Sequence, residues 1–256
     1  MSRYGIDENG RTVRFDFSAA MHTVLAGVTR SGKSVTAYSL LTEAALDPRV
    51  KVCGLDPSGI LLAPHCAAED LMTCHLGTKD PAGAIDAVER LVRIMDSRIK
   101  VLLERGFDKV PHECFSPRLP ILLVVLEEYA GTLEWLKGVD QSLKPAERLL
   151  PRMTSAVGRL LREGAKAGIR VFTIVQRPEA AVLHDRAQYA RRISHRIDNA
   201  DSMRMLFEGA KPEVLDRLKS AAPGIGLLDE AGEPLRFFRA YDLDYQSYRR
   251  VVLAAN

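Results

Sequence analysis

The chain has 256 residues, a formal net charge of +3 and 46% hydrophobic residues. This balance excludes a disordered chain, a collagen-like repeat and a coiled coil, and the length is ample for a large buried core. The longest apolar run, residues 120–126, is too short for a membrane span, which needs about 20 residues, and the polar N-terminus has no stretch typical of a secretion signal. The four cysteines are sparse, which favours a reducing compartment, so we expect a cytoplasmic protein.

Predicted strands alternate with predicted helices along the chain. Strands are expected at residues 11–17, 22–26, 50–55, 120–126, 169–175, 193–197, 224–228 and 234–240. Helices are expected at residues 33–45, 80–105 and 145–166, with a surface loop at 131–144. Because the central strands are apolar throughout, the pattern predicts an α/β fold with a mostly parallel sheet flanked by helices on both faces. We expect a single domain over residues 1–256, with its core at about 10–240 and a partly helical tail at 241–256.

A glycine-rich turn between a predicted strand and a predicted helix matches the whole Walker A pattern G-x-x-x-x-G-K-[ST]. The residues expected to bind nucleotide are Gly27, Val28, Thr29, Arg30, Ser31, Gly32, Lys33, Ser34 and Val35. Backbone amides of such a loop surround phosphate, the Lys33 ammonium adds a point charge and the Ser34 hydroxyl can ligate Mg²⁺. The sequence therefore predicts an ATP and Mg²⁺ site.

Two carboxylates follow the most apolar predicted strand, where Leu126 is succeeded by Glu127 and Glu128. Open parallel sheets bind ligands beyond the carboxyl ends of their strands, and a P-loop NTPase needs an acidic residue there. We expect Glu127 to lie near the Mg²⁺ shell and Glu128 to orient the attacking water. The alternative is a pair of solvated glutamates after a buried strand.

An ordered set of segments resembles the motor domain of the FtsK/SpoIIIE family of DNA translocases. The segments are VLAGVTRSGKSVTAYSLL, GLDPSGILL, VERLVRIMDSRIKVLLERG, LLVVLEEYA, GAKAGIRVFTIVQRPEA and NADSMRMLFEGA. The P-loop alone is shared by many families. The Gln-Arg-Pro sequence at 176–178, followed by Asp201 and Ser202, is more specific, and the resemblance covers roughly residues 10–240.

This resemblance implies a RecA-like P-loop NTPase fold. It also implies a ring, usually of six subunits, with ATP hydrolysed between subunits and double-stranded DNA passing through the central pore. Gln176 would then be a catalytic residue that senses the γ-phosphate or the attacking water. A glutamine amide suits this role because it can donate a hydrogen bond to phosphate and accept one from water.

The chain departs from the family pattern at three places. Both acids of the strand end are glutamate, where the family usually has aspartate and then glutamate. Arg30 occupies a P-loop position often held by glycine. Ala165 stands where the family commonly has an arginine, which leaves the trans-acting arginine finger unassigned. Its candidates are Arg159, Arg162 and Arg177.

Basic residues are concentrated late in the chain. Residues 151–204 hold eleven Lys or Arg and five acids, a local balance of 11 − 5 = +6. In the family, the region after Gln-Arg-Pro forms a DNA-facing loop, and Arg186 and Arg192 match its basic positions. Contacts to phosphate carry no sequence information, which suits a motor that moves over any sequence. The alternative is a solvated basic face or an ion-pair interface.

The predicted function is ATP-dependent translocation of double-stranded DNA by a ring of this chain. The family's membrane region and winged-helix module are absent from the sequence, so we expect a stand-alone motor from a mobile element, either a conjugative plasmid or a phage. Membrane or relaxosome-type partner proteins stay unidentified. Two alternatives remain open: a secretion-type ATPase of the same family that moves protein, and a module that binds ATP without hydrolysing it.

Overall fold

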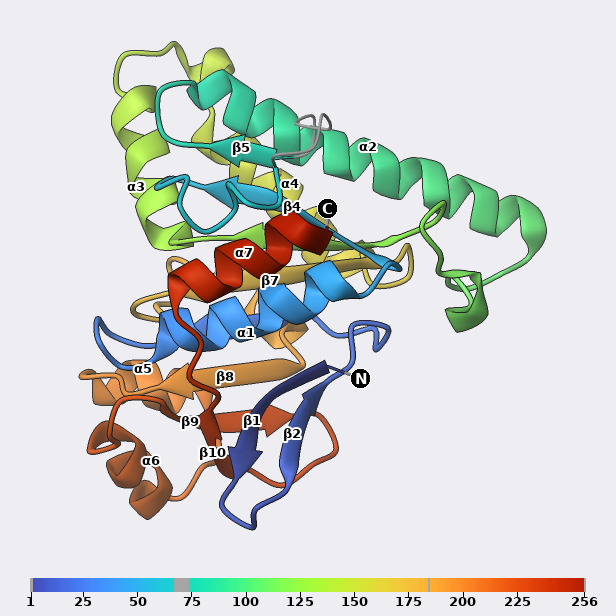
Figure 1. Ribbon diagram of the computed structural model, residues 1–256. Helices are drawn as coiled ribbons and strands as arrows, with labels where there is room; N and C mark the ends of the chain where they lie inside the picture. The colour runs from blue at the N-terminus through green and yellow to red at the C-terminus, as the bar shows by residue number, and fades with distance from the viewer. Residues whose placement is uncertain (1, 67–73, 184, 256) are drawn as a thin grey trace.

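The structure is a computed structural model that describes residues 2–66, 74–183 and 185–255. These residues form one ten-stranded sheet in the order β2-β1-β10-β9-β8-β3-β7-β6-β4-β5, covered by helices on both faces (Figure 1). The strands are β1 (Ser2–Asp7), β2 (Thr12–Phe15), β3 (Thr23–Ala26), β4 (Val50–Asp56), β5 (Cys74–Leu76), β6 (Ile121–Leu126), β7 (Ile169–Val175), β8 (Arg191–His195), β9 (Ile225–Glu230) and β10 (Arg236–Ala240). The α-helices are α1 (Lys33–Leu46), α2 (Pro81–Arg105), α3 (Tyr129–Asp140), α4 (Leu150–Glu163), α5 (Ala200–Leu206), α6 (Pro212–Lys219) and α7 (Tyr245–Ala255).

Six strands, β8, β3, β7, β6, β4 and β5, run parallel to one another. Strand β3 lies in the middle of the sheet, with Thr23 opposite Phe172 of β7 on one side and Arg191 of β8 on the other. All six residues of β6 and all seven of β7 are buried, because helices cover both faces of these strands. The α/β fold class is confirmed, and the parallel strands bring their carboxyl ends to one common edge.

The other four strands, β9, β10, β1 and β2, extend the sheet by antiparallel pairing. The sequence analysis did not predict β1, which pairs with β10 and buries Tyr4 completely. Its sequence, SRYGID, is mostly polar and gives little sign of a strand. The packed part of the chain therefore begins before residue 10, where the core was expected to start.

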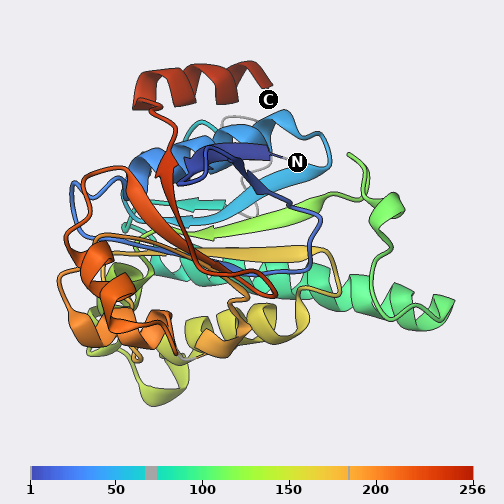
Figure 2. The same ribbon diagram turned by 90° about the horizontal axis from the view of Figure 1, so that it is seen from below.

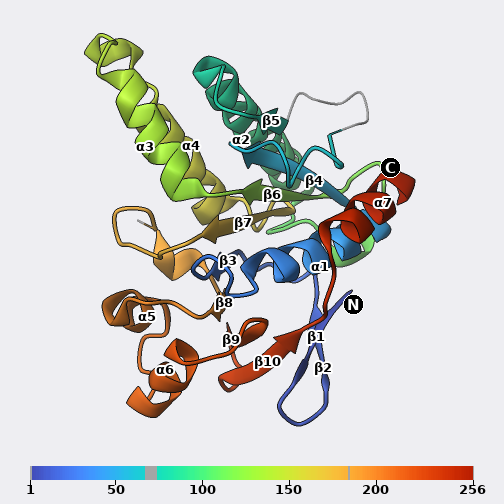
Figure 3. The same cartoon turned by 60° about the vertical axis from the view of Figure 1, so that its left-hand side comes forward.

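The two faces of the sheet carry different helices, and Figure 2 shows the resulting three layers. Helices α1 and α7 lie over one face, while α2, α3 and α4 lie over the other (Figures 1 and 3). Consecutive side chains of a strand point to opposite faces of the sheet: Val124 packs with α2 and α4, and Val125 packs with α1. Among the described helices, none is both long and apolar enough to cross a membrane.

The expectation of a surface loop at residues 131–144 is wrong, because α3 occupies most of this segment. Leu133 and Leu136 are spaced one helical turn apart and are buried against the core. Two glycines and several charged residues obscured that spacing in the sequence. The loop after α3 is fixed by Asp140, whose carboxylate accepts hydrogen bonds from the backbone amides of Leu149 (2.7 Å) and Leu150 (3.0 Å) at the start of α4.

The partly helical tail expected at residues 241–256 contains helix α7, which packs on the core. Tyr248 and Val252 are completely buried between α7 and α1. The Tyr248 ring stacks on Tyr38 of α1 with 5.0 Å between ring centroids. The Tyr245 hydroxyl donates a hydrogen bond of 3.2 Å to the carbonyl of Ile60, and the Tyr248 hydroxyl donates one to Leu61. Helix α7 thus supports the loop that follows β4.

Candidate nucleotide-binding site

The glycine-rich turn at residues 27–32 lies at the carboxyl edge of the sheet, between the end of β3 and the start of α1. Its backbone is tied to three neighbouring strands. The Gly27 amide donates to the Val175 carbonyl of β7 (3.3 Å), and the Val28 amide donates to the Arg196 carbonyl after β8 (3.0 Å). The Ser31 carbonyl accepts a hydrogen bond of 2.9 Å from the Gly224 amide before β9. These hydrogen bonds fix the shape of the loop.

Gly32 precedes α1 with φ 109° and ψ 0°, a left-handed conformation that favours glycine. A Cβ atom at this position would lie 2.6 Å from the Gly224 backbone nitrogen, which is itself fixed by its hydrogen bond to Ser31. Neither the backbone angles nor the space at Gly32 allow a side chain.

We expect Gly32→Ala to lower the free energy of unfolding by about 2–4 kcal/mol and to abolish nucleotide binding, because strain and a backbone clash act together. The matched control is Gly209→Ala, which has φ +82° but open space around the added Cβ. It should cost only about 1 kcal/mol and leave binding intact. Denaturant unfolding and calorimetric titration of MgATP measure both effects, and equal losses in the two variants would contradict the assigned role of Gly32.

His195, at the end of β8, packs against the glycine-rich turn on the side of the protein core. It is completely buried, and its Nδ1 donates a hydrogen bond of 3.0 Å to the Ile225 carbonyl. Its Nε2 accepts a hydrogen bond of 2.7 Å from the Thr36 hydroxyl in the first turn of α1. Burial lowers the pKa of His195 to about 4, so the ring is neutral at physiological pH. The role of His195 could not be predicted from the sequence, because its partners come from distant segments.

The turn, the end of β6 and the end of β7 surround a cavity of about 460 Å³. Its lining residues are Val28, Thr29, Arg30, Gly32, Lys33, Ser34, Val35, Glu127, Glu128, Gln176 and Pro223. The structure thus brings most of the residues predicted from the sequence into one place. Gly27 and Ser31 are not among the lining residues, and Ser31 is buried beneath the turn.

Lys33 and Glu128 meet across this cavity. The Lys33 Nζ lies 3.8 Å from the Glu128 Oε2, and their side chains are 13% and 28% exposed. Glu128 has φ 41° and ψ 52° and directly precedes α3, so its backbone is left-handed without being glycine. Gln176 follows β7 as an exposed residue on the cavity wall. A cation, two carboxylates and an amide therefore converge at the carboxyl edge of the sheet.

Burial, together with the charges of Asp56 and Glu128, raises the pKa of Glu127 to about 7, and the charge of Lys33 opposes the shift. Asp56 ends the neighbouring strand β4 and is buried. Its carboxylate accepts hydrogen bonds from the amides of Ser58 (3.0 Å) and Leu62 (2.9 Å), which shape the loop after β4. Asp56 could have been found from the sequence, since it is an acid that directly follows an apolar strand.

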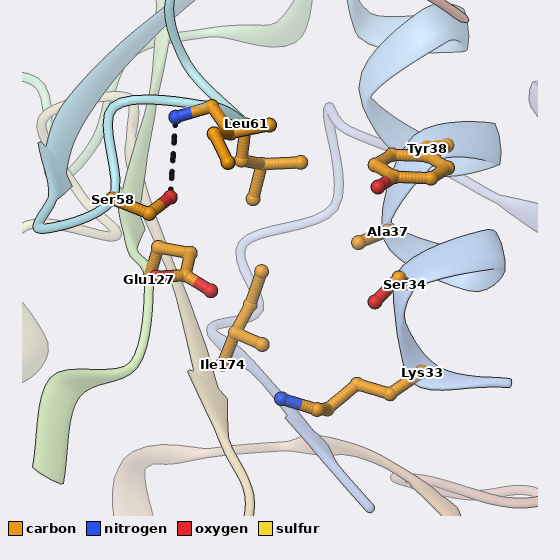
Figure 4. Close-up of a pocket in the computed structure, with 9 residues that line it drawn as sticks. Lys33, Ser34, Ala37, Tyr38, Ser58, Leu61, Glu127 and Ile174 are labelled. Carbon is orange, nitrogen blue, oxygen red and sulfur yellow. Dashed lines mark hydrogen bonds between the residues drawn. The ribbon is translucent and has the colours of Figure 1, made fainter. Parts of the chain in front are cut away.

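The same loop bounds a second hollow, of about 180 Å³, between the end of β6 and α1. Figure 4 shows the side chains of Ser34 and Lys33 pointing into it from α1, and Glu127 from the opposite side. A hydroxyl and a carboxylate that face one another are the oxygen ligands Mg²⁺ prefers. Ser34 and Glu127 therefore suit the predicted Mg²⁺ site.

The three candidates for an arginine finger all make ion pairs within the chain. Arg159 pairs with Asp96 and Glu163, Arg162 pairs with Asp185, and Arg177 pairs with Asp198. These pairs are on the protein surface, where each contributes little to stability and can exchange for another partner. The structure does not single out one of the three.

The two arginines expected to contact DNA differ in their surroundings. Arg186 lies in a short 3-10 helix between β7 and β8 and is exposed. Arg192 lies in β8, and its guanidinium donates hydrogen bonds to the carbonyls of Tyr189 (3.2 Å) and Leu206 (3.0 Å). Arg192 also approaches Asp229 to 3.6 Å. Its side chain is engaged in holding α5 and β9 to β8, whereas that of Arg186 is accessible.

Comparison with known proteins adds independent information. Residues 3–116 match the model of the FtsK/SpoIIIE family. The DNA translocase SftA of Bacillus subtilis (strain 168) is 25% identical over 244 residues, which cover 91% of this chain and 24% of that protein. The DNA translocase FtsK of Sporosarcina ureae is 24% identical over 233 residues, which cover 82% of this chain and 27% of that protein. The resemblance to the FtsK/SpoIIIE family is confirmed. The chain spans about a quarter of the length of these curated relatives.

Solved structures give the same fold. The conjugation coupling protein TcpA of pCW3 superposes with a TM-score of 0.75 at 19% identity, over 99% of this chain and 70% of that chain. The cytoplasmic domain of the type VII secretion ATPase EccC of Thermomonospora curvata gives a TM-score of 0.73 at 21% identity, over 99% of this chain and 30% of that chain. The chain therefore has the P-loop ATPase fold that was predicted from the sequence.

Proposed function

We propose that this chain is an ATP-hydrolysing motor domain that moves double-stranded DNA. The observation that carries the proposal is the convergence of Lys33, Ser34, Glu128 and Gln176 on one cavity at the carboxyl edge of a P-loop ATPase fold. A cation next to a glycine-rich turn binds phosphate, and acids and an amide from neighbouring strands can position a water for attack.

Each residue has a separate role in this proposal. The turn and Lys33 bind the phosphates, while Ser34 and Glu127 would hold Mg²⁺, which neutralises phosphate charge when it is bound. Glu128 accepts a hydrogen bond from the attacking water and orients it. Gln176 contacts the γ-phosphate and couples its presence or loss to the position of β7 and of the loop that follows. That loop carries Arg186, so it links the nucleotide site to the surface proposed for DNA.

The DNA part of the proposal is supported by three observations. Its curated relatives are named DNA translocases. Residues 151–204 carry eleven basic and five acidic side chains, and Arg186 among them is exposed. We further propose that several copies, in the simplest case six, form a ring around the duplex, as a motor that uses sites between subunits requires. A mobile element as its source is part of the same proposal.

We expect Arg186→Ala to weaken binding of duplex DNA about three- to tenfold and to reduce the slope of log K against log salt by about 1, while basal ATP hydrolysis is unchanged. The control is Arg14→Ala, which removes an exposed arginine from the edge strand β2. Fluorescence anisotropy with a labelled duplex at several salt concentrations measures the slope. An unchanged slope in Arg186→Ala, or an equal loss in Arg14→Ala, would remove Arg186 from the DNA surface.

A further inference from the structure

Arg30 occupies the fourth position of the glycine-rich turn, and its backbone has φ 60°. Among the described residues, Arg30 and Glu128 are the two that adopt positive φ without being glycine. Both line the 460 Å³ cavity. Left-handed backbone is unfavourable for a residue with a Cβ atom, and such strain concentrates at functional sites.

The conformation of Arg30 is imposed by its neighbours. The Ser31 amide donates a hydrogen bond of 3.2 Å to the Val28 carbonyl, and Val28 is itself tied to Arg196. The turn therefore has the same shape whatever residue stands at position 30, and glycine would adopt that shape without strain. An exposed arginine here brings no packing that would offset the strain.

The charges around the cavity suggest what the side chain does. Lys33 already faces Glu128 at 3.8 Å, and the half-buried Glu127 and the buried Asp56 are two further acids at the neighbouring strand ends. A magnesium-bound nucleoside triphosphate keeps a net negative charge, so it needs more positive charge than Lys33 alone provides. Within the described part of the chain, Arg30 has no acidic partner to neutralise its guanidinium.

We propose that Arg30 is a second phosphate-binding cation of this site, supplied by the same chain, and that it favours nucleoside triphosphate over diphosphate. The inference rests on the nucleotide site proposed above. A guanidinium can donate two hydrogen bonds to one phosphate group, and its effect grows with the charge on the ligand. The gain in affinity offsets the strain stored in the backbone.

Four variants test this role by calorimetric titration with MgATPγS and with MgADP. Arg30→Ala and Arg30→Gly should each weaken MgATPγS binding about tenfold and MgADP binding about threefold or less. Arg30→Lys should stay within about threefold of the native protein for both ligands. Arg118→Ala, which removes an exposed arginine before β6 at the opposite edge of the sheet, should change neither.

A thermal melt without ligand separates binding from folding. Arg30→Gly relieves the left-handed strain, so its melting temperature should equal or exceed that of the native protein even though it binds ATPγS more weakly. Native-like affinity in both Arg30→Ala and Arg30→Gly, or an equal loss for MgATPγS and MgADP, would overturn the inference and leave the nucleotide site standing. No binding by the native protein would overturn the proposed site itself, and the inference with it.

Discussion

Lys33→Ala is expected to weaken MgATP binding by at least about a hundredfold and to abolish hydrolysis. The Lys33 side chain is only 13% exposed, and its ammonium lies 3.8 Å from the Glu128 carboxylate. Its removal takes away a charge-assisted contact to phosphate, which alone is worth about 1.5–3 kcal/mol. It also removes the positive charge that faces Glu128 at 3.8 Å, so the cavity becomes more negative and binds an anion less well.

Calorimetric titration and a phosphate-release assay measure the two effects of Lys33→Ala. The control is Lys100→Ala, which removes an exposed lysine of α2 that pairs with Glu104 four residues later. That variant should bind and hydrolyse ATP as the native protein does. Retention of MgATP affinity within about threefold in Lys33→Ala would show that the cavity is not the phosphate site.

Glu128→Gln should lower the rate of ATP hydrolysis about a hundred- to ten-thousandfold while MgATP binding is kept or becomes tighter. The amide has nearly the same shape, but it cannot take up a proton and it polarises water less. The loss of a carboxylate 3.8 Å from Lys33 also leaves that lysine free to bind phosphate. Hydrolysis and affinity therefore move independently, as expected of a residue that acts on the attacking water.

Glu134→Gln on α3 is the matched control, because Glu134 is an exposed glutamate paired with Lys137. Single-turnover measurements with saturating MgATP separate the chemical step from product release. If hydrolysis persists in Glu128→Gln but is lost in Glu127→Gln, then Glu127 and not Glu128 orients the attacking water. No hydrolysis by the native chain under any condition would instead favour a module that binds ATP without turnover.

The features predicted correctly from the sequence are those encoded by contiguous residues. Three segments carry such a local pattern: the glycine-rich turn, the apolar strand before Glu127 and the strand before Gln176. Each pattern can be read from neighbouring residues, without knowledge of tertiary contacts. Parallel pairing then places their ends at one edge, so the composition of the cavity follows from the fold class. This is why most of its lining residues were anticipated.

The features that were missed depend on contacts between distant segments. Helix α7 looks like a tail in the sequence, and only its packing on Tyr38 makes it part of the core. His195 becomes a support of the turn because Thr36 and Ile225 meet it in space. The hydrogen bonds from the Arg192 guanidinium to the carbonyls of Tyr189 and Leu206 also could not be foreseen, and its contact with DNA stays a prediction.

The central claim is that ATP hydrolysis by this chain is coupled to duplex DNA. The most direct test is the steady-state rate of phosphate release by the purified chain, with and without long duplex DNA, at low and moderate salt. The proposed motor predicts strong stimulation by DNA that fades as salt rises, because the stimulating contacts are to phosphates. A rate that is substantial but indifferent to DNA at every salt concentration would contradict the claim and direct attention to a protein substrate.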